Sequence, residues 1–257
     1  MGKGGLFDLT GKVAVVTGGN GGIGLGIARG LARAGADIAV VGRQAGKLEA
    51  AVAELEGLGV QAAGIACDVT DEAAVAAMAA EVGERFGRLD ILVNNAGTSV
   101  RKAPQDLTAE DWHQVIDTNM TSAVLCAKAC YPLMKAAGGG KVINNGSMLS
   151  IFGAPWNAAY GASKGGVMQF SRSLATAWAP DNIQVNCILP GWIDTDLTKK
   201  ARQQVEGLHE RILARTPAGR WGNPDDFAGV AVFLASAASD FITGVALPVD
   251  GGYSIAI

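Results

Sequence analysis

Three side chains in one stretch of the chain have the types and the spacing needed to move a proton to or from a substrate oxygen. Tyr160 and Lys164 stand four residues apart in Tyr-Gly-Ala-Ser-Lys, and Ser147 lies 13 positions upstream of the tyrosine. On a helix, this spacing puts the phenol and the ammonium on one face. A nearby ammonium favours phenolate and lowers a tyrosine pKa from about 10, so we expect Tyr160 to act as an acid or base near neutral pH.

The segments that must position these residues alternate between strand and helix. Short runs rich in valine, isoleucine and alanine predict strands, and the longer stretches between them predict helices. The order predicts an α/β fold with a doubly wound, Rossmann-type parallel sheet of about seven strands, helices on both faces and a single domain over residues 1–257. The predicted strands are 12–16, 38–41, 60–66, 89–93, 141–145, 183–189 and 245–249, and the predicted helices are 22–34, 44–58, 71–86, 108–136, 158–179 and 224–236.

Composition excludes several classes of function. The net charge of −3 argues against a nucleic-acid surface, and no stretch reaches the ~18 apolar residues of a membrane-spanning helix. The N-terminus has no apolar core of a signal peptide, so we expect a cytoplasmic protein that binds neither nucleic acid nor membrane. The two histidines, His113 and His209, lack neighbours that could share a metal, so we expect no metal site.

A glycine-rich loop connects the first predicted strand to the first predicted helix. It reads Thr-Gly-Gly-Asn-Gly-Gly-Ile-Gly over residues 17–24. Glycines let the backbone turn tightly against a pyrophosphate, and the following helix points its first N–H groups at the phosphates. The loop therefore predicts a dinucleotide site, whose contacts we assign to Gly18, Asn20, Gly22, Ile23 and Gly24.

The spacing of this loop, Thr-Gly-x3-Gly-Ile-Gly, resembles that of the short-chain dehydrogenase/reductase family. The resemblance extends over residues 9–253, because further landmarks of the family follow in its order. These are Asn94-Asn95-Ala96-Gly97 after the fourth strand, Asn119 in the next helix, the Ser147, Tyr160 and Lys164 set, and Pro190-Gly191-Trp192-Ile193-Asp194-Thr195 after the sixth strand.

The resemblance implies a role for each matching residue. Tyr160 is the acid/base of an oxidoreductase that interconverts a secondary alcohol and a ketone, and Ser147 holds the substrate oxygen. Lys164 binds the nicotinamide ribose and lowers the tyrosine pKa, while Asn119 supports a water that links Lys164 to solvent. The remaining cofactor contacts implied by the family are Asp68 and Val69 at the adenine, Asn95, Ala96 and Gly97 along the cleft, and Pro190, Gly191, Ile193 and Thr195 near the nicotinamide.

The end of the second strand favours NADP(H) over NAD(H), which remains possible. Gly42 stands where NAD-preferring relatives carry an aspartate, and Arg43 can pair with a 2′-phosphate. NADP-preferring relatives often have a second basic residue in the glycine loop, but this loop offers only Asn20 and Gly21.

The substrate is the least defined part of the prediction. We expect Arg101, Asn157 and Trp192 to line its pocket with Ser147 and Tyr160, although Arg101 is equally well explained as a solvated loop charge. The charged stretch 196–216 is expected to form a mobile lid.

Three short motifs look similar to sugar-acid dehydrogenases of the family, such as gluconate 5-dehydrogenase and 2-deoxy-gluconate 3-dehydrogenase. They are Ser147-Met-Leu-Ser, Gly219-Arg-Trp-Gly and Phe233-Leu-Ala-Ser. We therefore expect a small polar, sugar-acid-like substrate. A β-ketoacyl-carrier-protein reductase is the alternative, because it shares almost every motif, and a non-catalytic dinucleotide-binding module is a third. Members of the family are commonly homotetramers.

Overall fold

The computed structural model describes residues 5–256, and one parallel sheet of seven strands runs through them in the order β3-β2-β1-β4-β5-β6-β7. The strands are β1 (Val13–Thr17), β2 (Asp37–Gly42), β3 (Ala62–Ala66), β4 (Ile91–Asn94), β5 (Gly140–Asn145), β6 (Ile183–Pro190) and β7 (Ala246–Val249). The α-helices are α1 (Gly22–Arg33), α2 (Ala45–Glu56), α3 (Glu72–Phe86), α4 (Ala109–Ile116), α5 (Ser122–Ala136), α6 (Ala158–Trp178), α7 (Asp196–Gln204), α8 (Leu208–Arg215) and α9 (Ala228–Ala235).

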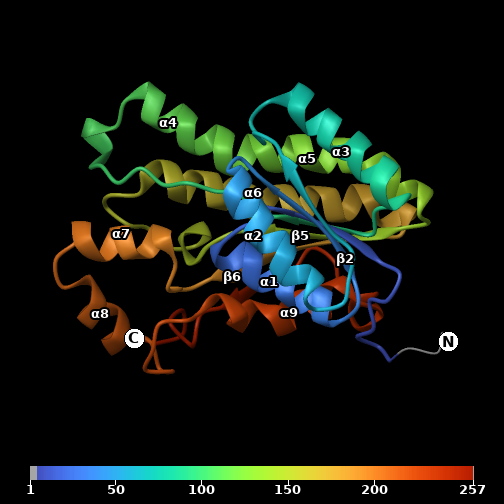
Figure 1. Cartoon of the computed structure of the whole chain (residues 1–257). Coiled ribbons are helices and arrows are strands. Elements are labelled where there is room, and N and C mark those ends of the chain that lie inside the picture. Colours follow the sequence, from blue (N-terminus) through green and yellow to red (C-terminus); the bar gives the residue numbers. More distant parts are fainter. Residues whose placement is uncertain (1–4, 257) are drawn as a thin grey trace.

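Helices cover the sheet on both faces, as the doubly wound prediction requires (Figure 1). Alternate residues of β1 point to opposite sides: Ala14 and Val16 pack with α1, α2 and α9, while Val13 and Val15 pack with α3, α5 and α6. Because side chains alternate along a strand, a strand that is buried on both faces must be apolar throughout. The Rossmann-type α/β prediction is therefore confirmed, with seven strands as expected.

The predicted elements lie within one or two residues of the observed ones, apart from two helices. The predicted helix 108–136 is interrupted by a π-helical turn, Asp117–Thr121, between α4 and α5. The predicted helix 224–236 begins as a 3-10 turn, Pro224–Phe227, capped by the side chain of Asn223. The widened π turn is the more informative difference, because such turns often occur at functional sites and Asn119 lies in this one.

The strand order reverses direction beside β1, and this reversal opens a crevice at the carboxyl ends of the strands. The chain moves from β1 outward to β2 and β3, then returns to β4 on the other side of β1. Open α/β sheets bind ligands at such a switch point. The hydroxyl of Thr17 joins the two ends here, because it accepts hydrogen bonds from the backbone N–H groups of Asn95 and Ala96 at 2.9 and 3.1 Å.

The charged stretch 196–216, which we expected to be a mobile lid, consists of α7 and α8, shown in orange at one end of the molecule in Figure 1. Most of its charged side chains are exposed, while Ala201, Leu208 and Ile212 form a small apolar cluster with Trp192 and Trp221. The stretch is thus helical and packed against the loops beneath it. Among residues 5–256, no helix has the length and apolar character needed to cross a bilayer.

Candidate active site and dinucleotide groove

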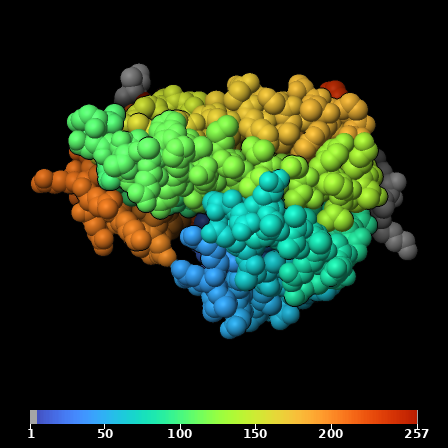
Figure 2. All heavy atoms as spheres, turned by 90° about the horizontal axis from the view of Figure 1, so that it is seen from above, coloured from blue at the N-terminus to red at the C-terminus, as the bar shows by residue number. Residues whose placement is uncertain are grey.

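Three adjoining cavities form one groove along the carboxyl edge of the sheet. The outer cavity, of about 730 Å³, lies over β2 and β3, and the central cavity, of about 300 Å³, lies over the glycine loop. Ser147 and Tyr160 line both the central cavity and a third one of about 320 Å³. Seen from above, the surface is hollowed where the blue, green and orange parts of the chain meet (Figure 2). The outer and central cavities together have room for a dinucleotide, and the third cavity has room for a small molecule.

The glycine loop has the backbone geometry of a phosphate cradle. Gly18 and Gly22 have φ values of +62° and +52°, which favour glycine. No side chain caps the N-terminus of α1, and its first turn carries no acidic residue. By contrast, α3 and α4 are capped by Asp71 and Thr108. The free N–H groups of α1 therefore remain available for an anion such as a pyrophosphate.

Gly24 packs closely against the end of β1. It does not line the groove, whereas the other cofactor residues expected from the sequence do. A Cβ at Gly24 would come within 2.4 Å of Asn95 Nδ2 and of the Gly18 carbonyl oxygen. This glycine therefore lets α1 approach the end of β1 closely, and a contact between Gly24 and the cofactor stays a prediction.

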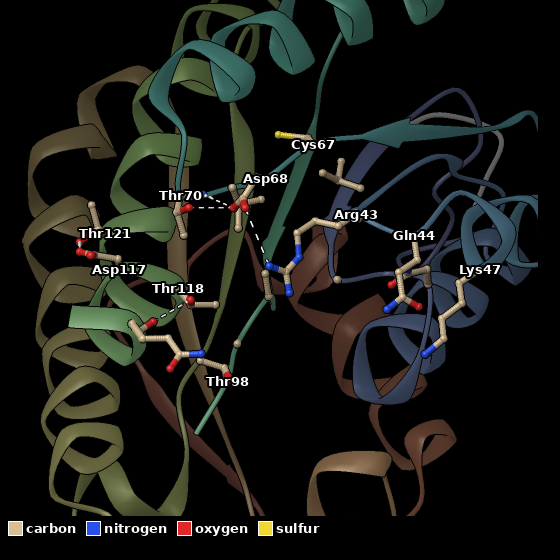
Figure 3. A pocket seen from close by; sticks show the side chains of 18 residues that line it. Arg43, Gln44, Lys47, Cys67, Asp68, Thr70, Thr98, Asp117, Thr118 and Thr121 are labelled. Carbon is tan, nitrogen blue, oxygen red and sulfur yellow. Dashed lines mark hydrogen bonds and ion pairs between the residues drawn. The ribbon is translucent and has the colours of Figure 1, made fainter. Parts of the chain in front are cut away.

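The outer cavity is lined by two basic side chains, Arg43 and Lys47, and by two carboxylates, Asp68 and Asp117 (Figure 3). Arg43 reaches toward Asp68, with 3.8 Å between Nη1 and Oδ2, and Lys47 projects from the first turn of α2 beside it. Two hydrogen bonds from Thr70, and the Arg43 charge more weakly, lower the pKa of Asp68. Lys47 also lines the central cavity, so this residue lies where the two cavities meet.

An acidic side chain at position 42 would require the Asn20 side chain to move. A Cβ there would come within 2.7 Å of the Asn20 side-chain nitrogen. Asn20 thus fills the space that an aspartate after β2 would occupy. This packing agrees with the expectation, drawn from Gly42 and Arg43, that the groove favours a 2′-phosphate over a free ribose hydroxyl.

Lys164 is the buried cation of the central cavity. It is 3% exposed, and its Nζ donates a hydrogen bond to the Asn145 carbonyl oxygen at 2.6 Å. Burial lowers the pKa of Lys164 to about 8, because the charged form loses its water. The Nζ lies 5.7 Å from the centre of the Tyr160 ring, so the predicted pair on one helix face is present on α6.

The expected lowering of the tyrosine pKa by Lys164 is not found. Burial raises the pKa of Tyr160 above its ordinary value, and the neighbouring Ser147 hydroxyl and the Arg101 charge only partly oppose this. The ammonium of Lys164 is directed to the Asn145 carbonyl rather than to the phenol oxygen. In the protein alone, Tyr160 therefore stays protonated near neutral pH, which is the form that donates a proton.

Asn119 joins the segments around Lys164. Its amide donates to the Thr98 carbonyl and to the Ser163 hydroxyl, each at 3.0 Å, and its oxygen accepts from the Thr98 N–H at 2.7 Å. A Cβ on Gly97 would lie 3.2 Å from Asn119 Oδ1 and 3.7 Å from Lys164 Nζ. The π turn, the strand end at Gly97 and the lysine thus converge on one point.

The third cavity holds all the residues that we expected to contact substrate. Arg101, Asn157 and Trp192 line it together with Ser147 and Tyr160. Asn157 accepts a hydrogen bond from Ser99 at 3.0 Å, which fixes its amide. Lys102, the neighbour of Arg101, pairs with Asp111 on α4 instead.

Arg101 is held over the third cavity by uncharged groups. Its guanidinium donates to the Leu197 carbonyl oxygen at 3.4 Å and to the Gln204 side chain at 3.3 Å, both on α7. Burial lowers the pKa of Arg101. Arg101 is therefore not a solvated loop charge, the alternative that the sequence left open, because its side chain is half-buried and faces the cavity.

Sequence reasoning missed three residues of the groove. Lys47 could have been found, because it follows Arg43 by four residues, one helical turn away. Asn145 lines the central cavity with an amide oxygen that has no hydrogen-bond partner among the described residues, so a bound donor could satisfy it. Arg215, the last residue of α8, reaches the third cavity from 55 residues beyond Tyr160, and no local pattern marks it.

Comparisons with known proteins find a family model and curated relatives that match nearly the whole chain. A family model described as enoyl-(acyl carrier protein) reductase matches residues 18–254. The chain is 44% identical over 248 residues to a 2-dehydro-3-deoxy-D-gluconate 5-dehydrogenase of Pseudoalteromonas atlantica, covering 96% of this chain and 97% of the relative. It is 38% identical over 252 residues to the gluconate 5-dehydrogenase of Gluconobacter oxydans, covering 98% of both.

A solved structure agrees with these relatives. The gluconate 5-dehydrogenase of Burkholderia cenocepacia, determined in complex with NADP and tartrate, superposes with a TM-score of 0.93 at 39% identity, and the match covers 98% of each chain.

Proposed function

Because this chain belongs to the short-chain dehydrogenase/reductase family, we propose that it is an NADP(H)-dependent oxidoreductase that interconverts a hydroxyl and a keto group on a small sugar acid. The observation that carries the proposal is the third cavity. It opens onto Ser147 and Tyr160, and its lining includes two arginines, Arg101 and Arg215, but no carboxylate. A carboxylate on the substrate would supply the missing charge.

The catalytic residues are proposed to be Ser147, Tyr160, Lys164 and Asn119. A bound nicotinamide exchanges a hydride with the substrate carbon. Tyr160 donates a proton to the carbonyl oxygen during reduction and accepts it during oxidation, while the Ser147 hydroxyl holds that oxygen by a hydrogen bond. Such preplaced donors stabilise the charge that develops on the oxygen.

Lys164 and Asn119 support the tyrosine in this proposal. The Lys164 ammonium favours the phenolate that forms when Tyr160 gives up its proton. Asn119 fixes the segment around residue 98 against α6, and it holds the water through which Lys164 is proposed to recover a proton from solvent. The contacts of Asn119 with Thr98 and Ser163 support this placement.

The cofactor contacts proposed for NADP(H) run along the groove from end to end. Arg43 and Lys47 bind the 2′-phosphate, and the adenine lies by Asp68 and Val69. The pyrophosphate lies against the glycine loop and α1. The nicotinamide half is proposed to meet Asn95, Ala96, Gly97, Pro190, Gly191, Ile193 and Thr195, all of which line the central cavity. The NADP of the Burkholderia relative supports the choice of nucleotide.

A substrate panel tests the proposed function. Purified protein is given hexonates, keto-hexonates, simple ketones and β-ketoacyl thioesters with NADP(H) and with NAD(H), and nucleotide absorbance is followed. We expect turnover of sugar acids and a preference for NADP(H). Turnover of acyl thioesters alone would establish the β-ketoacyl-carrier-protein reductase instead, and binding of nucleotide with no turnover of any compound would point to a non-catalytic module.

We also propose that the chain works in the cytoplasm as a homotetramer of single-domain subunits. Its four cysteines are free and buried, which suits a reducing compartment. Trp112 on α4 and Val124 on α5 are large apolar side chains with exposed fractions of 39% and 36%, and they suit a subunit contact. Light scattering coupled to size exclusion is expected to give four times the 26.2 kDa subunit mass, and a monomer would refute the assembly.

A further inference from the structure

Arg215 is an exposed side chain that lines the third cavity and has no anionic partner among the described residues. Its guanidinium lies 4.4 Å from the centre of the Tyr253 ring and 5.5 Å from that of Phe152. No hydrogen bond or ion pair joins it to another side chain among residues 5–256. Aromatic rings that cover the faces of a guanidinium leave the N–H donors along its edge free, and this edge fits a carboxylate in a bidentate manner.

Several other arginines in the described part of the chain form ion pairs with carboxylates. Arg29 pairs with Glu54, Arg88 with Asp90 and Arg220 with Asp226. Among the described arginines without a carboxylate partner, Arg33, Arg172 and Arg211 line none of the three cavities, whereas Arg101 and Arg215 both line the third one. The charge of this cavity is thus positive in a chain whose net charge is −3. Uncompensated arginines in a concave site are typical of anion recognition.

The two arginines contact different parts of the third cavity. Arg101 donates a hydrogen bond to the carbonyl oxygen of Leu197, which lines both the central and the third cavity, whereas Arg215 contacts Phe152 and Tyr253, which line only the third. Residues shared with the central cavity, among them Ser147 and Tyr160, mark the reacting end of the third cavity. Arg101 also lines only the third cavity, but Arg215 and both rings that it contacts are absent from the lining of the central cavity, so we assign them to the end away from Ser147 and Tyr160.

We propose that Arg215, steadied by Tyr253 and Phe152, binds the substrate carboxylate and thereby selects the carbon that reacts. A carboxylate at this remote end places the reacting carbon several bonds along the chain. The substrate is therefore a hydroxy or keto acid that is changed far from its carboxyl group, not at the neighbouring carbon. Arg101 acts nearer the reacting carbon, on the hydroxyl groups around it. This inference rests on the proposed function and deepens it.

The test compares an acid with its own primary amide, which has the same shape without the charge. The acid is the best substrate found in the panel, and kcat and KM are measured for both compounds in the wild type and in Arg215→Ala. We expect kcat/KM for the acid to fall by about 10- to 100-fold, mainly through KM, as expected for a lost charged hydrogen bond, while the value for the amide stays nearly constant. Arg215→Lys is expected to recover part of the preference for the acid.

Two further variants complete the design. Arg211→Ala removes an exposed arginine one turn earlier on α8 that lines none of the three cavities, and it is expected to keep wild-type kinetics. Arg101→Ala is expected to lower kcat/KM for the acid and for the amide by similar factors.

Three results would overturn the inference. Equal losses for acid and amide in Arg215→Ala would indicate a structural role, no loss would remove Arg215 from the site, and loss of acid preference in Arg101→Ala alone would place the carboxylate there. Failure of every sugar acid in the panel would instead refute the proposed function.

Discussion

At the scale of single residues, the preference for NADP(H) depends on whether two cations meet at the ribose end of the groove. Arg43 is three-quarters exposed and lies 3.8 Å from Asp68, so part of its charge is already balanced. Lys47 makes no ion pair with the described residues and lines both the outer and the central cavity. Lys47 is therefore our proposed source of the second positive charge that the glycine loop lacks.

Lys47→Ala is expected to weaken NADPH binding about tenfold, as for a lost charge-assisted hydrogen bond, while NADH binding changes little. The dissociation constants are measured by the fluorescence of the reduced nucleotides. Arg33→Ala is the matched control, because this exposed arginine at the end of α1 lines no part of the groove. Equal weakening of NADPH and NADH in Lys47→Ala would contradict a role at the 2′-phosphate.

The buried Lys164 leads to a pH-dependent prediction. Its pKa is lowered to about 8, so the ammonium is present below that pH and is lost above it. Tyr160 has a raised pKa and keeps its proton through the same range. We therefore expect kcat/KM for ketone reduction, which reports the free enzyme, to decline as pH rises through about 8.

Lys164→Arg provides the comparison for this profile, because a guanidinium keeps its charge at every accessible pH. The variant is expected to be slower but to lose the inflection near pH 8. A wild-type profile that stays flat up to pH 10 would show that the charge of Lys164 does not limit reduction in the free enzyme.

At the scale of elements, the position of α1 depends on glycines that face α9 and the turn before it. A Cβ at Gly30 would lie 2.6 Å from Ala228 Cα, and one at Gly26 would lie 2.0 Å from the Pro224 carbonyl oxygen. The helix can therefore approach its neighbours only without side chains at these positions. Because the N-terminus of α1, the proposed pyrophosphate site, lines the central cavity, this packing also positions one wall of the groove.

Gly30→Ala is expected to destabilise the fold by about 1–3 kcal/mol, because the added methyl group overpacks the contact. The control is Gly46→Ala in the first turn of α2, where an added Cβ meets nothing within 4 Å. There, alanine is expected to stabilise by about 0.5–1 kcal/mol through its lower chain entropy. Denaturant melts measure both, and similar stability of the two variants would argue against close packing as the role of Gly30.

The helices and strands were predicted well because the spacing of apolar residues and the positions of glycines and helix caps mark the same boundaries along the chain. Apolar strands bounded by glycine, and helices begun by caps such as Thr108, leave few alternatives. The π turn at Asn119 was missed, because nothing in Asp-Thr-Asn-Met-Thr distinguishes a π turn from an α-helical one. The π turn depends on tertiary contacts instead, because the side chain of Asn119 donates hydrogen bonds to Thr98 and Ser163, which are distant in the sequence.

At the scale of the whole molecule, the groove unites residues from every part of the chain. Those in the glycine loop and in Tyr-x3-Lys were predictable, because short spacing dictates their geometry. Arg215 was not, since it meets Tyr253 and Phe152 only when three distant segments pack together. The pKa of Tyr160 was predicted in the wrong direction for the same reason, because burial depends on the whole fold and outweighs one nearby charge.

The most direct test of the central claim is the turnover of a sugar acid with NADP⁺ by Tyr160→Phe, measured beside the binding of NADPH. We predict that kcat falls by about 10²–10⁴-fold or more, because the proton acceptor is lost, while the dissociation constant of NADPH stays close to that of the wild type. Turnover at the wild-type rate with intact nucleotide binding would contradict the claim that Tyr160 is the acid/base of this site.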